Sequence, residues 1–413
     1  MSLAVPVAVV GGGAAGLMAA ISAAAHGASV TLLEGTDRLG TKILMSGGTR
    51  CNVTHDFVSP VDYYGGSRNV VARLLREFAR EAAARFFRED LGVALKREDT
   101  GKLFPESDDA QTVLDALLRR AGEVGVVILT GRKVTAIAPL SAGSGYLLTT
   151  TAGELEAQRV ILTTGGLSFP RTGSDGTGYA LAQSLGHTIE TTTPALTPMV
   201  ARGGGMHERL RGVTLDVALT VRVAEKKVWE GTGSFLFTHF GYSGPVVLDA
   251  SRHVARAEGP FAVVASFLPG MTMEAVEEMI LRVGSRQARL SALSFVRGRV
   301  PESLAWEVVA YAAVPPDRPL GQLRREERRA LALALVEYEL PVLEVMGYRK
   351  AEVTAGGVPL SEVDPRTMES RRAPGLYLAG EILGVDGRLG GYNFQFAWST
   401  GWIAGKGAAR AAS

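Results

Sequence analysis

The stretch Val7-Ala8-Val9-Val10-Gly11-Gly12-Gly13-Ala14-Ala15-Gly16 decides the fold. Its short β-branched apolar run predicts a buried strand, and the alanine-rich segment that follows predicts a helix. Gly11 permits a tight turn, Gly13 leaves the backbone open to a pyrophosphate, and Gly16 lets the helix lie close to the strand. The helix would then present unpaired N–H groups, those of Ala14 and Ala15 included, to an anion.

A second predicted strand, Ser29 to Leu33, ends in Glu34. That position, about 20 residues after the turn, suits an acid that accepts a ribose 2′-hydroxyl. The same acid repels a 2′-phosphate, so the pattern predicts FAD or NAD rather than NADP. The alternative is a structural glycine turn in an ordinary parallel sheet.

The composition is that of a globular protein with two or three domains. The chain has 413 residues, of which 46% are hydrophobic and 21% charged, with a formal net charge of +2. No block of like charge stands out, so we expect no nucleic-acid partner. A small molecule is the expected substrate, and the oligomeric state stays open.

The single cysteine, Cys51, excludes an intrachain disulfide and a redox-active dithiol. Six histidines are scattered without metal-ligand spacing, so no metal site is predicted. No apolar run approaches the roughly 20 residues of a membrane span, and no leader segment precedes the first strand. We therefore expect no membrane association and a cytoplasmic protein.

The first half of the chain alternates apolar-periodic and glycine-rich segments. Residues 35–52 are small and polar and predict a loop around a polar ligand. The periodicity predicts helices over 69–90 and 109–123, and strands over 126–129, 133–137, 145–151, 154–158 and 159–162.

Near residue 191 the composition changes, and an insertion of different character begins. Strong alternation predicts one antiparallel strand over 213–228, and 261–268 is a second. Residues 269–330 read as helical, and 331–346 as strand because Pro341 would interrupt a helix. The chain then returns to a buried strand ending in Gly380-Glu381 and to a last helix over 394–409, whose small residues allow close packing against the first helix.

Three glycine-rich segments, near residues 11, 163 and 380, each follow a buried strand and outline an FAD-binding domain. The N-terminal turn would hold the pyrophosphate, and Glu381 suits a ribityl hydroxyl. The start of the last helix, at Gly391-Tyr392-Asn393, can stabilise negative charge on the N1–C2 carbonyl edge of a reduced flavin.

Several motifs in the same order resemble the BaiN-like group of bacterial flavoproteins over essentially the full chain. The matching segments are Val9 to Gly16, Lys42 with Ser46 to Thr54, Phe237 to Pro245, Thr354 to Val358, Met368 to Ser370, and Gly380-Glu381 through Gly390 to Gln395. Members of that group are known as NAD(P)/FAD-dependent oxidoreductases, aminoacetone-oxidase-like enzymes or reductases of unsaturated oxo-bile acids. The family pattern usually has a third glycine where this chain has Thr49.

The resemblance implies an α/β fold, with a Rossmann-like FAD-binding domain (three-layer ββα) over 1–190 and 350–413. A β-barrel-like domain over 191–268 and 331–349 would interrupt it and carry a helical insert over 269–330. The positions that we expect to bind FAD, beyond Gly11, Gly13, Ala14, Ala15, Gly16 and Glu34, are Arg38, Lys42, Ser46, Gly47, Gly48, Cys51, Asn52, Val134, Thr164, Gly165, Gly380, Glu381, Gly391, Tyr392, Asn393 and Phe394.

Three residues are candidates for catalysis. His239 and Tyr242 lie in a loop that the resemblance places facing the flavin, and either could protonate a substrate after hydride delivery. Arg50 could contact phosphate or steady the charge of a reduced flavin. The structural alternatives are a loop hydrogen bond for His239 and a salt bridge for Arg50. Cys51 could be a redox-active or flavin-contacting thiol, but a small packed side chain is the simpler interpretation, because no nearby lysine or second cysteine is evident to lower its pKa.

Arg171 and Arg388 could anchor an acidic substrate, although solvated loop arginines are the plainer interpretation. No second G-x-G-x-x-G unit is present, so NAD(P)H would visit the flavin transiently as a co-substrate. The expected function is an FAD-dependent oxidoreductase that reduces an activated double bond conjugated with a carbonyl. The alternatives are an amine or amino-ketone oxidase and a non-catalytic flavin redox sensor.

Overall fold

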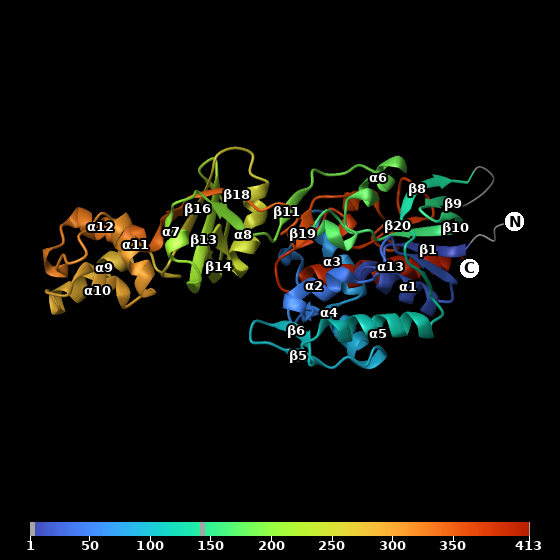
Figure 1. Cartoon of the computed structure of the whole chain (residues 1–413), viewed down its shortest axis with the longest axis horizontal. Helices are drawn as coiled ribbons and strands as arrows, with labels where there is room; N and C mark the ends of the chain where they lie inside the picture. The colour runs from blue at the N-terminus through green and yellow to red at the C-terminus, as the bar shows by residue number, and fades with distance from the viewer. Residues whose placement is uncertain (1–4, 141–144, 413) are drawn as a thin grey trace. The chain divides into compact units, whose positions relative to one another are not determined.

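The computed structural model describes residues 5–140 and 145–412 and divides the chain into two compact units (Figure 1). Unit 1 comprises residues 1–194 and 351–413, and unit 2 comprises residues 195–350. The sequence placed the corresponding limits of the FAD domain at 190 and 350.

Unit 1 is built on a parallel sheet whose central strand is β1 (Val5–Val10). β1 pairs in parallel with β2 (Val30–Leu33) and with β10 (Gly153–Leu162). Further parallel neighbours are β7 (Val127–Leu129), beside β2, and β20 (Leu376–Leu378), beside β10. Because all these strands run the same way, their carboxyl ends, where Gly11, Glu34 and Thr163 follow, meet at one edge.

An antiparallel meander adjoins this sheet. β8 (Val134–Pro139) pairs with β9 (Tyr146–Thr150), and β9 pairs with the first half of β10. β10 is therefore one continuous strand that takes part in both the parallel sheet and the antiparallel meander. The sequence predicted separate strands over 154–158 and 159–162.

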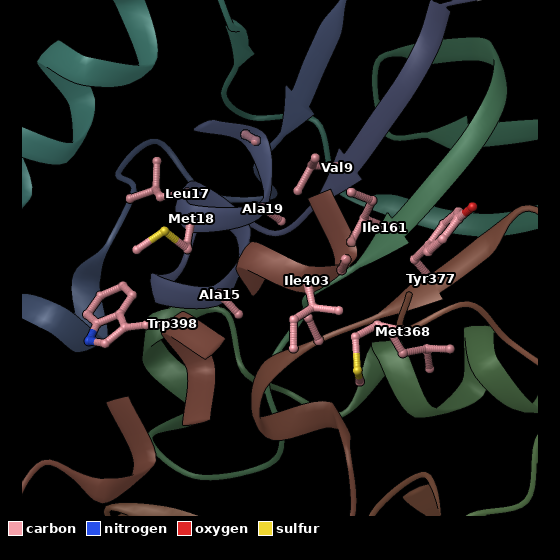
Figure 2. Packing of buried hydrophobic residues seen from close by; sticks show 14 of the residues in the cluster. Val9, Ala15, Leu17, Met18, Ala19, Ile161, Met368, Tyr377, Trp398 and Ile403 are labelled. Carbon is pink, nitrogen blue, oxygen red and sulfur yellow. The ribbon is translucent and has the colours of Figure 1, made fainter. Parts of the chain in front are cut away.

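Two helices far apart in sequence, α1 (Ala14–Ala25) and α13 (Tyr392–Ala412), pack closely together. A Cβ on Gly401 would lie 2.5 Å from the carbonyl oxygen of Ala15, and one on Gly405 would lie 2.2 Å from that of Ala19. Figure 2 shows Ala15, Met18 and Ala19 of α1 beside Trp398 and Ile403 of α13. The expected close packing of the last helix on the first is confirmed.

The remaining elements of unit 1 surround this core. They are α2 (Thr41–Thr49), β3 (Thr54–His55), β4 (Tyr63–Tyr64), α3 (Arg68–Glu77), α4 (Arg80–Arg85), β5 (Leu95–Arg97), β6 (Lys102–Pro105), α5 (Ala110–Glu123), α6 (Thr177–Ser184), β11 (Thr193–Ala195), β19 (Val353–Ala355) and β21 (Asp386–Gly387).

Unit 2 contains an antiparallel sheet in the order β17-β16-β13-β14-β15-β12-β18. Its strands are β12 (Met199–Ala201), β13 (Thr214–Val223), β14 (Lys226–Thr238), β15 (Gly241–Ser243), β16 (Phe261–Ser266), β17 (Tyr338–Leu340) and β18 (Val342–Val345). The two outermost strands, β17 and β18, are separated in sequence only by Pro341. Pro341 therefore joins the two strands at opposite ends of this sheet order.

Helices complete unit 2. They are α7 (Met206–Arg209), α8 (Pro245–Ala255), α9 (Met273–Arg286), α10 (Ala292–Arg297), α11 (Glu302–Tyr311) and α12 (Arg325–Val336). The prediction of strand over 331–346 was wrong for its first part, because α12 continues to Val336. The helical segment thus extends past its expected end at 330.

Two other sequence predictions need correction. The expected strand over 213–228 is a hairpin, because Ala224 and Glu225 both have positive φ and reverse the chain. The expected helix over 69–90 breaks at Phe78, whose carbonyl oxygen accepts hydrogen bonds from Gln395 Nε2 and Ser399 Oγ on α13. These contacts join residues more than 300 positions apart, so local periodicity could not reveal them.

Candidate flavin site

The turn between β1 and α1 has the geometry that the glycines predict. Gly11 has φ +102°, and a Cβ on Gly16 would lie 1.8 Å from the carbonyl oxygen of Gly11. At Gly13, by contrast, a Cβ would meet no described atom within 4 Å. Among the described residues, no side chain caps the start of α1. Open space therefore lies over the helix N-terminus, where backbone N–H groups can hold an anion.

Glu34 lies beside this turn at the end of β2. Its carboxylate accepts hydrogen bonds from the N–H groups of Gly12 and Thr36, each at 2.8 Å. The loop after it lies close to Lys133, the residue directly before Val134, since a Cβ on Gly35 would lie 3.1 Å from the Cβ of Lys133. Val134 itself is buried, and Arg38 is exposed.

The structure brings the three glycine-rich segments together. Thr163 Oγ1 donates to the carbonyl oxygens of Val10 (2.8 Å) and Gly11 (2.9 Å). A Cβ on Gly380, which has φ +79°, would lie 2.6 Å from that of Ala15. Thr164 Oγ1 is buried and has no hydrogen-bond partner among the described residues. Next to it, Gly165 has φ +73°.

Glu381 belongs to a polar network that the sequence only partly anticipated. Lys42 forms an ion pair with its Oε2, while Ser168 Oγ (2.6 Å) and Thr354 N–H (3.0 Å) donate to its Oε1. Lys42 Nζ also donates to Ser168 Oγ. Sequence reasoning did not select Ser168 or Thr354, although Thr354 begins one of the matching motifs.

The segment after Lys42 is helical to Met45 and then leaves helical geometry at Ser46, Gly47 and Gly48. The prediction of a loop over 35–52 was therefore wrong for 41–45. A Cβ on Gly48 would meet no described atom within 4 Å. Thr49, at the usual glycine position, has φ +69°, a left-handed conformation that a β-branched residue adopts only under strain.

The segment 51–54 is fastened to α13. Trp398 Nε1 donates to the carbonyl oxygen of Val53 at 2.9 Å, and Thr54 Oγ1 donates to Gln395 Oε1 at 2.7 Å. Cys51 is fully buried, and this burial raises the pKa of its thiol to about 12. The structure thus favours the packed side chain over the reactive thiol.

The start of α13 lies against the same segment. A Cβ on Gly391 would lie 2.8 Å from the carbonyl oxygen of Thr54 and 2.9 Å from Asn52 Oδ1. Tyr392 stacks on His55 with ring centroids 5.0 Å apart, a contact that no sequence pattern predicted. Asn393 Oδ1 accepts from Gly387 N–H at 2.8 Å, and Phe394 stacks on Trp398.

These residues fit FAD. The open helix N-terminus at Gly13 suits a pyrophosphate, and the acid Glu34 suits a ribose. Asn52 Oδ1 is a buried polar atom without a partner among the described residues, so a polar ligand can complete its hydrogen bonding.

Comparison with known proteins decides the family. The model of the HI0933-like protein Rossmann domain matches residues 5–407. The chain belongs to the HI0933-like family.

The family's members that resemble this chain include two enzymes with different names. One is the 3-dehydro-bile acid Δ(4,6)-reductase of Clostridium scindens, 35% identical over 97% of this chain and 98% of that protein. Another is the ribosomal RNA dihydrouridine synthase of Escherichia coli K12, 32% identical over 95% of each chain. Among solved structures, the 3-ketosteroid Δ4-(5α)-dehydrogenase of Rhodococcus jostii RHA1 shares the fold, with a TM-score of 0.51, 17% identity, and coverage of 98% of this chain and 96% of that one. This HI0933-like chain is an FAD-dependent oxidoreductase with a Rossmann-like FAD-binding fold.

Two of the three predicted catalytic residues do not have the surroundings that the prediction required. Tyr242 lies inside the hydrophobic core of unit 2, between Phe235 and Phe237, and burial raises the pKa of its hydroxyl well above the ordinary value. Its hydroxyl has no hydrogen-bond partner among the described residues, so it belongs to the core and not to a proton-donating loop.

Arg50 lies within ion-pair distance of two acidic side chains, in line with the salt bridge that was the structural alternative for this residue. Its guanidinium donates to Glu98 at 2.6 Å, lies 3.5 Å from Asp108 and stands over the ring of Phe104. His239, by contrast, is exposed at the turn between β14 and β15. Arg388 pairs with Asp62 at 3.0 Å, and Arg171 is exposed.

A Ser–His–Glu array lies apart from these residues in unit 1. His187 Nδ1 is 2.7 Å from Glu362 Oε2, and its Nε2 is 2.8 Å from Ser370 Oγ. The N–H groups of Arg372 and Ala373 both donate to that same Oγ, which occupies its lone pairs. The Ser370 hydroxyl therefore links the backbone at 372 and 373 to His187, which is a structural role.

Within 5–140 and 145–412 no group of three or more histidine, cysteine or acidic side chains is arranged to hold a metal ion. In the same ranges, none of the helices combines the length and the apolar character needed to cross a bilayer.

Proposed function

We propose that this protein reduces a carbon–carbon double bond conjugated with a carbonyl group, with electrons that NAD(P)H delivers to FAD. The observation that carries the proposal is the pair of relatives named above. The 4,6-double bonds of a 3-dehydro bile acid are conjugated with its 3-keto group. The 5,6-double bond of uridine, which is saturated in dihydrouridine, is conjugated with a ring carbonyl. One reaction type therefore covers both names.

When bound, FAD supplies hydride transfer through its N5 atom. In the proposal, the N–H groups at the start of α1 hold the pyrophosphate, and Glu34 accepts a ribose hydroxyl. The N-terminus of α13 would stabilise negative charge on a reduced flavin, because the N-terminal end of a helix carries the positive end of its dipole. Lys42 keeps the Glu381 carboxylate paired and oriented.

Reduction of a conjugated double bond also needs a proton for the second carbon. We propose His239 as the donor, since it alone of the predicted catalytic residues keeps an exposed acid–base side chain. NAD(P)H would bind transiently, because the sequence holds one G-x-G-x-x-G unit and that unit serves FAD.

A second candidate substrate is uridine in ribosomal RNA. It is favoured by the 32% identity to a ribosomal RNA dihydrouridine synthase over 95% of the chain. The outer face of α3 also carries three exposed arginines, Arg68, Arg73 and Arg76, which could contact phosphates. On this proposal the expectation of no nucleic-acid partner would be wrong.

A turnover assay separates these substrates. The purified FAD-loaded protein is incubated with NADH or NADPH and a 3-keto-4-ene steroid acid, a small acyclic enone, an unmodified ribosomal RNA transcript, or an alkene without a carbonyl as control. Mass spectrometry then scores the gain of two hydrogen atoms. Reduction of one conjugated substrate and not of the isolated alkene supports the proposal. Oxygen consumption with an amine donor and no reduction of any conjugated bond would contradict it.

A further inference from the structure

The side chain of Asn52 carries an unused hydrogen-bond acceptor. It is only 7% exposed, and its Oδ1 has no hydrogen-bond partner in the part of the chain that the structure describes. Native proteins pair nearly all such buried atoms, and each exception calls for an explanation, of which a water, ion or ligand that completes the bonding is one. Asn52 is therefore a candidate for direct contact with a bound molecule.

The surroundings of Asn52 hold it in place. The N–H of the next residue, Val53, donates to the carbonyl oxygen of Leu103 at 2.9 Å, and the Val53 carbonyl accepts from Trp398 Nε1. Thr54 is tied to Gln395, which also donates to the carbonyl oxygen of Phe78. The segment is thus fixed from both sides, so the unpaired Oδ1 is a property of a rigid site.

The unpaired acceptor lies next to the start of α13. Asn52 Oδ1 is 2.9 Å from the position of a Cβ on Gly391, the residue directly before α13. The first backbone N–H groups of a helix have no intrahelical acceptor. The side chain of Asn393 does not fill this space, because its Oδ1 and Nδ2 bond both to the N–H and to the carbonyl of Gly387. The site therefore places one unpaired acceptor beside the start of α13.

The oxidised isoalloxazine ring has the complementary pattern on one edge. N3–H is the only N–H of that ring system, and carbonyl groups at C2 and C4 flank it. We infer that Asn52 Oδ1 accepts the hydrogen bond of flavin N3–H, and that the N-terminus of α13 donates to a neighbouring carbonyl. Asn52 is thus a positioning residue that orients the pyrimidine edge. This inference rests on FAD binding and not on the identity of the substrate.

The decisive probe is N3-methyl-FAD, which lacks this donor. We expect the wild-type apoprotein to bind it about tenfold more weakly than FAD, as the loss of one buried hydrogen bond implies. Asn52→Ala should bind FAD about tenfold more weakly than the wild type does and bind the two flavins equally, since the acceptor is gone and room for the methyl group is made. Asn69→Leu, on the exposed face of α3, is the matched control and should leave both affinities unchanged.

Asn52→Asp is a second variant that keeps the acceptor and the volume. It should retain the preference for FAD over N3-methyl-FAD, and its bound flavin should have a lower reduction potential than in the wild type, because the added negative charge opposes reduction. Equal affinity of the wild type for both flavins would overturn the inference. A penalty for N3-methyl-FAD that persists in Asn52→Ala would overturn it too. All these readouts are binding constants or potentials, so they stand apart from any failure to find a substrate.

Discussion

Alanine substitutions at two glycines of the same turn should have different effects, one on FAD binding and one on stability. Gly13 has φ −81° and ψ −167°, which alanine adopts freely, and a Cβ there would meet no described atom within 4 Å. Gly16 has no such room, because its Cβ would lie 1.8 Å from the carbonyl oxygen of Gly11 and 2.7 Å from Thr163 Oγ1. Gly13→Ala should therefore weaken only FAD binding, whereas Gly16→Ala should destabilise the fold.

The magnitudes follow from these contacts. A methyl group on Gly13 would push a pyrophosphate off the helix N-terminus and remove about one charge-assisted hydrogen bond, worth about 1.5–3 kcal/mol. FAD affinity should fall roughly 10- to 150-fold, while the free energy of unfolding of the apoprotein changes by less than about 1 kcal/mol. Gly16→Ala should lower that free energy by about 3 kcal/mol or more, because two backbone segments must separate.

The assay pairs FAD titration, followed by quenching of flavin fluorescence, with urea unfolding of the apoprotein. Gly122→Ala on α5 is the control, since a Cβ there also meets no described atom within 4 Å and the site lies elsewhere. It should leave the FAD affinity unchanged. Wild-type affinity in Gly13→Ala would refute the placement of the pyrophosphate, and wild-type stability in Gly16→Ala would refute the close approach of α1 to the turn.

Three further predictions concern single side chains. Burial alone would raise the pKa of Glu362, but hydrogen bonds from His187, Thr188 and Arg372 outweigh it and lower that pKa. The stabilisation is therefore complete above the unfolded pKa, about 4.3, and is lost as the pH falls through the lower folded value. Glu362→Gln should remove this part of the acid dependence in urea melts, and an unchanged pH profile would contradict the network. Thr49→Gly should raise the free energy of unfolding by about 0.5–1 kcal/mol, since the strain relieved exceeds the added chain entropy; a lower melting temperature would count against strain. Tyr242→Phe should leave turnover unchanged and stability equal or up to about 1 kcal/mol higher, because its hydroxyl is buried without a described partner. A large loss of turnover in Tyr242→Phe would restore it as a catalytic residue.

The parts of the site that sequence could predict are those set by local backbone geometry. Gly11, Gly13 and Gly16 have roles that follow from the absence of a Cβ, and the strand before them and the helix after them are both periodic. The position of Glu34 follows from the strand that precedes it. For such residues the reasoning needs no knowledge of distant contacts, and the structure has them where the pattern requires.

The parts that sequence missed are set by contacts across the chain. Ser168 and Thr354 meet Glu381 only after segments near residues 168, 354 and 381 come together. Tyr242 looked like an exposed loop residue because glycine and serine surround it, but alternation along the short strand β15 turns its ring into the core of unit 2. The break at Phe78 likewise depends on Gln395 and Ser399.

The sheet of unit 2 combines both cases. Pro341 was correctly taken as incompatible with a helix interior, and it does separate two strands. That β17 and β18 pair with opposite ends of one sheet depends on long-range pairing, which short-range alternation does not encode.

The most direct test of the central claim is an anaerobic titration of the FAD-loaded protein with NADH and then NADPH, followed at the visible absorption band of the flavin. We predict that one nucleotide bleaches the band within seconds, and that a conjugated enone or a ribosomal RNA transcript then restores it without oxygen. A band that neither nucleotide bleaches, together with bleaching by an amine donor, would contradict the account and make the protein an oxidase.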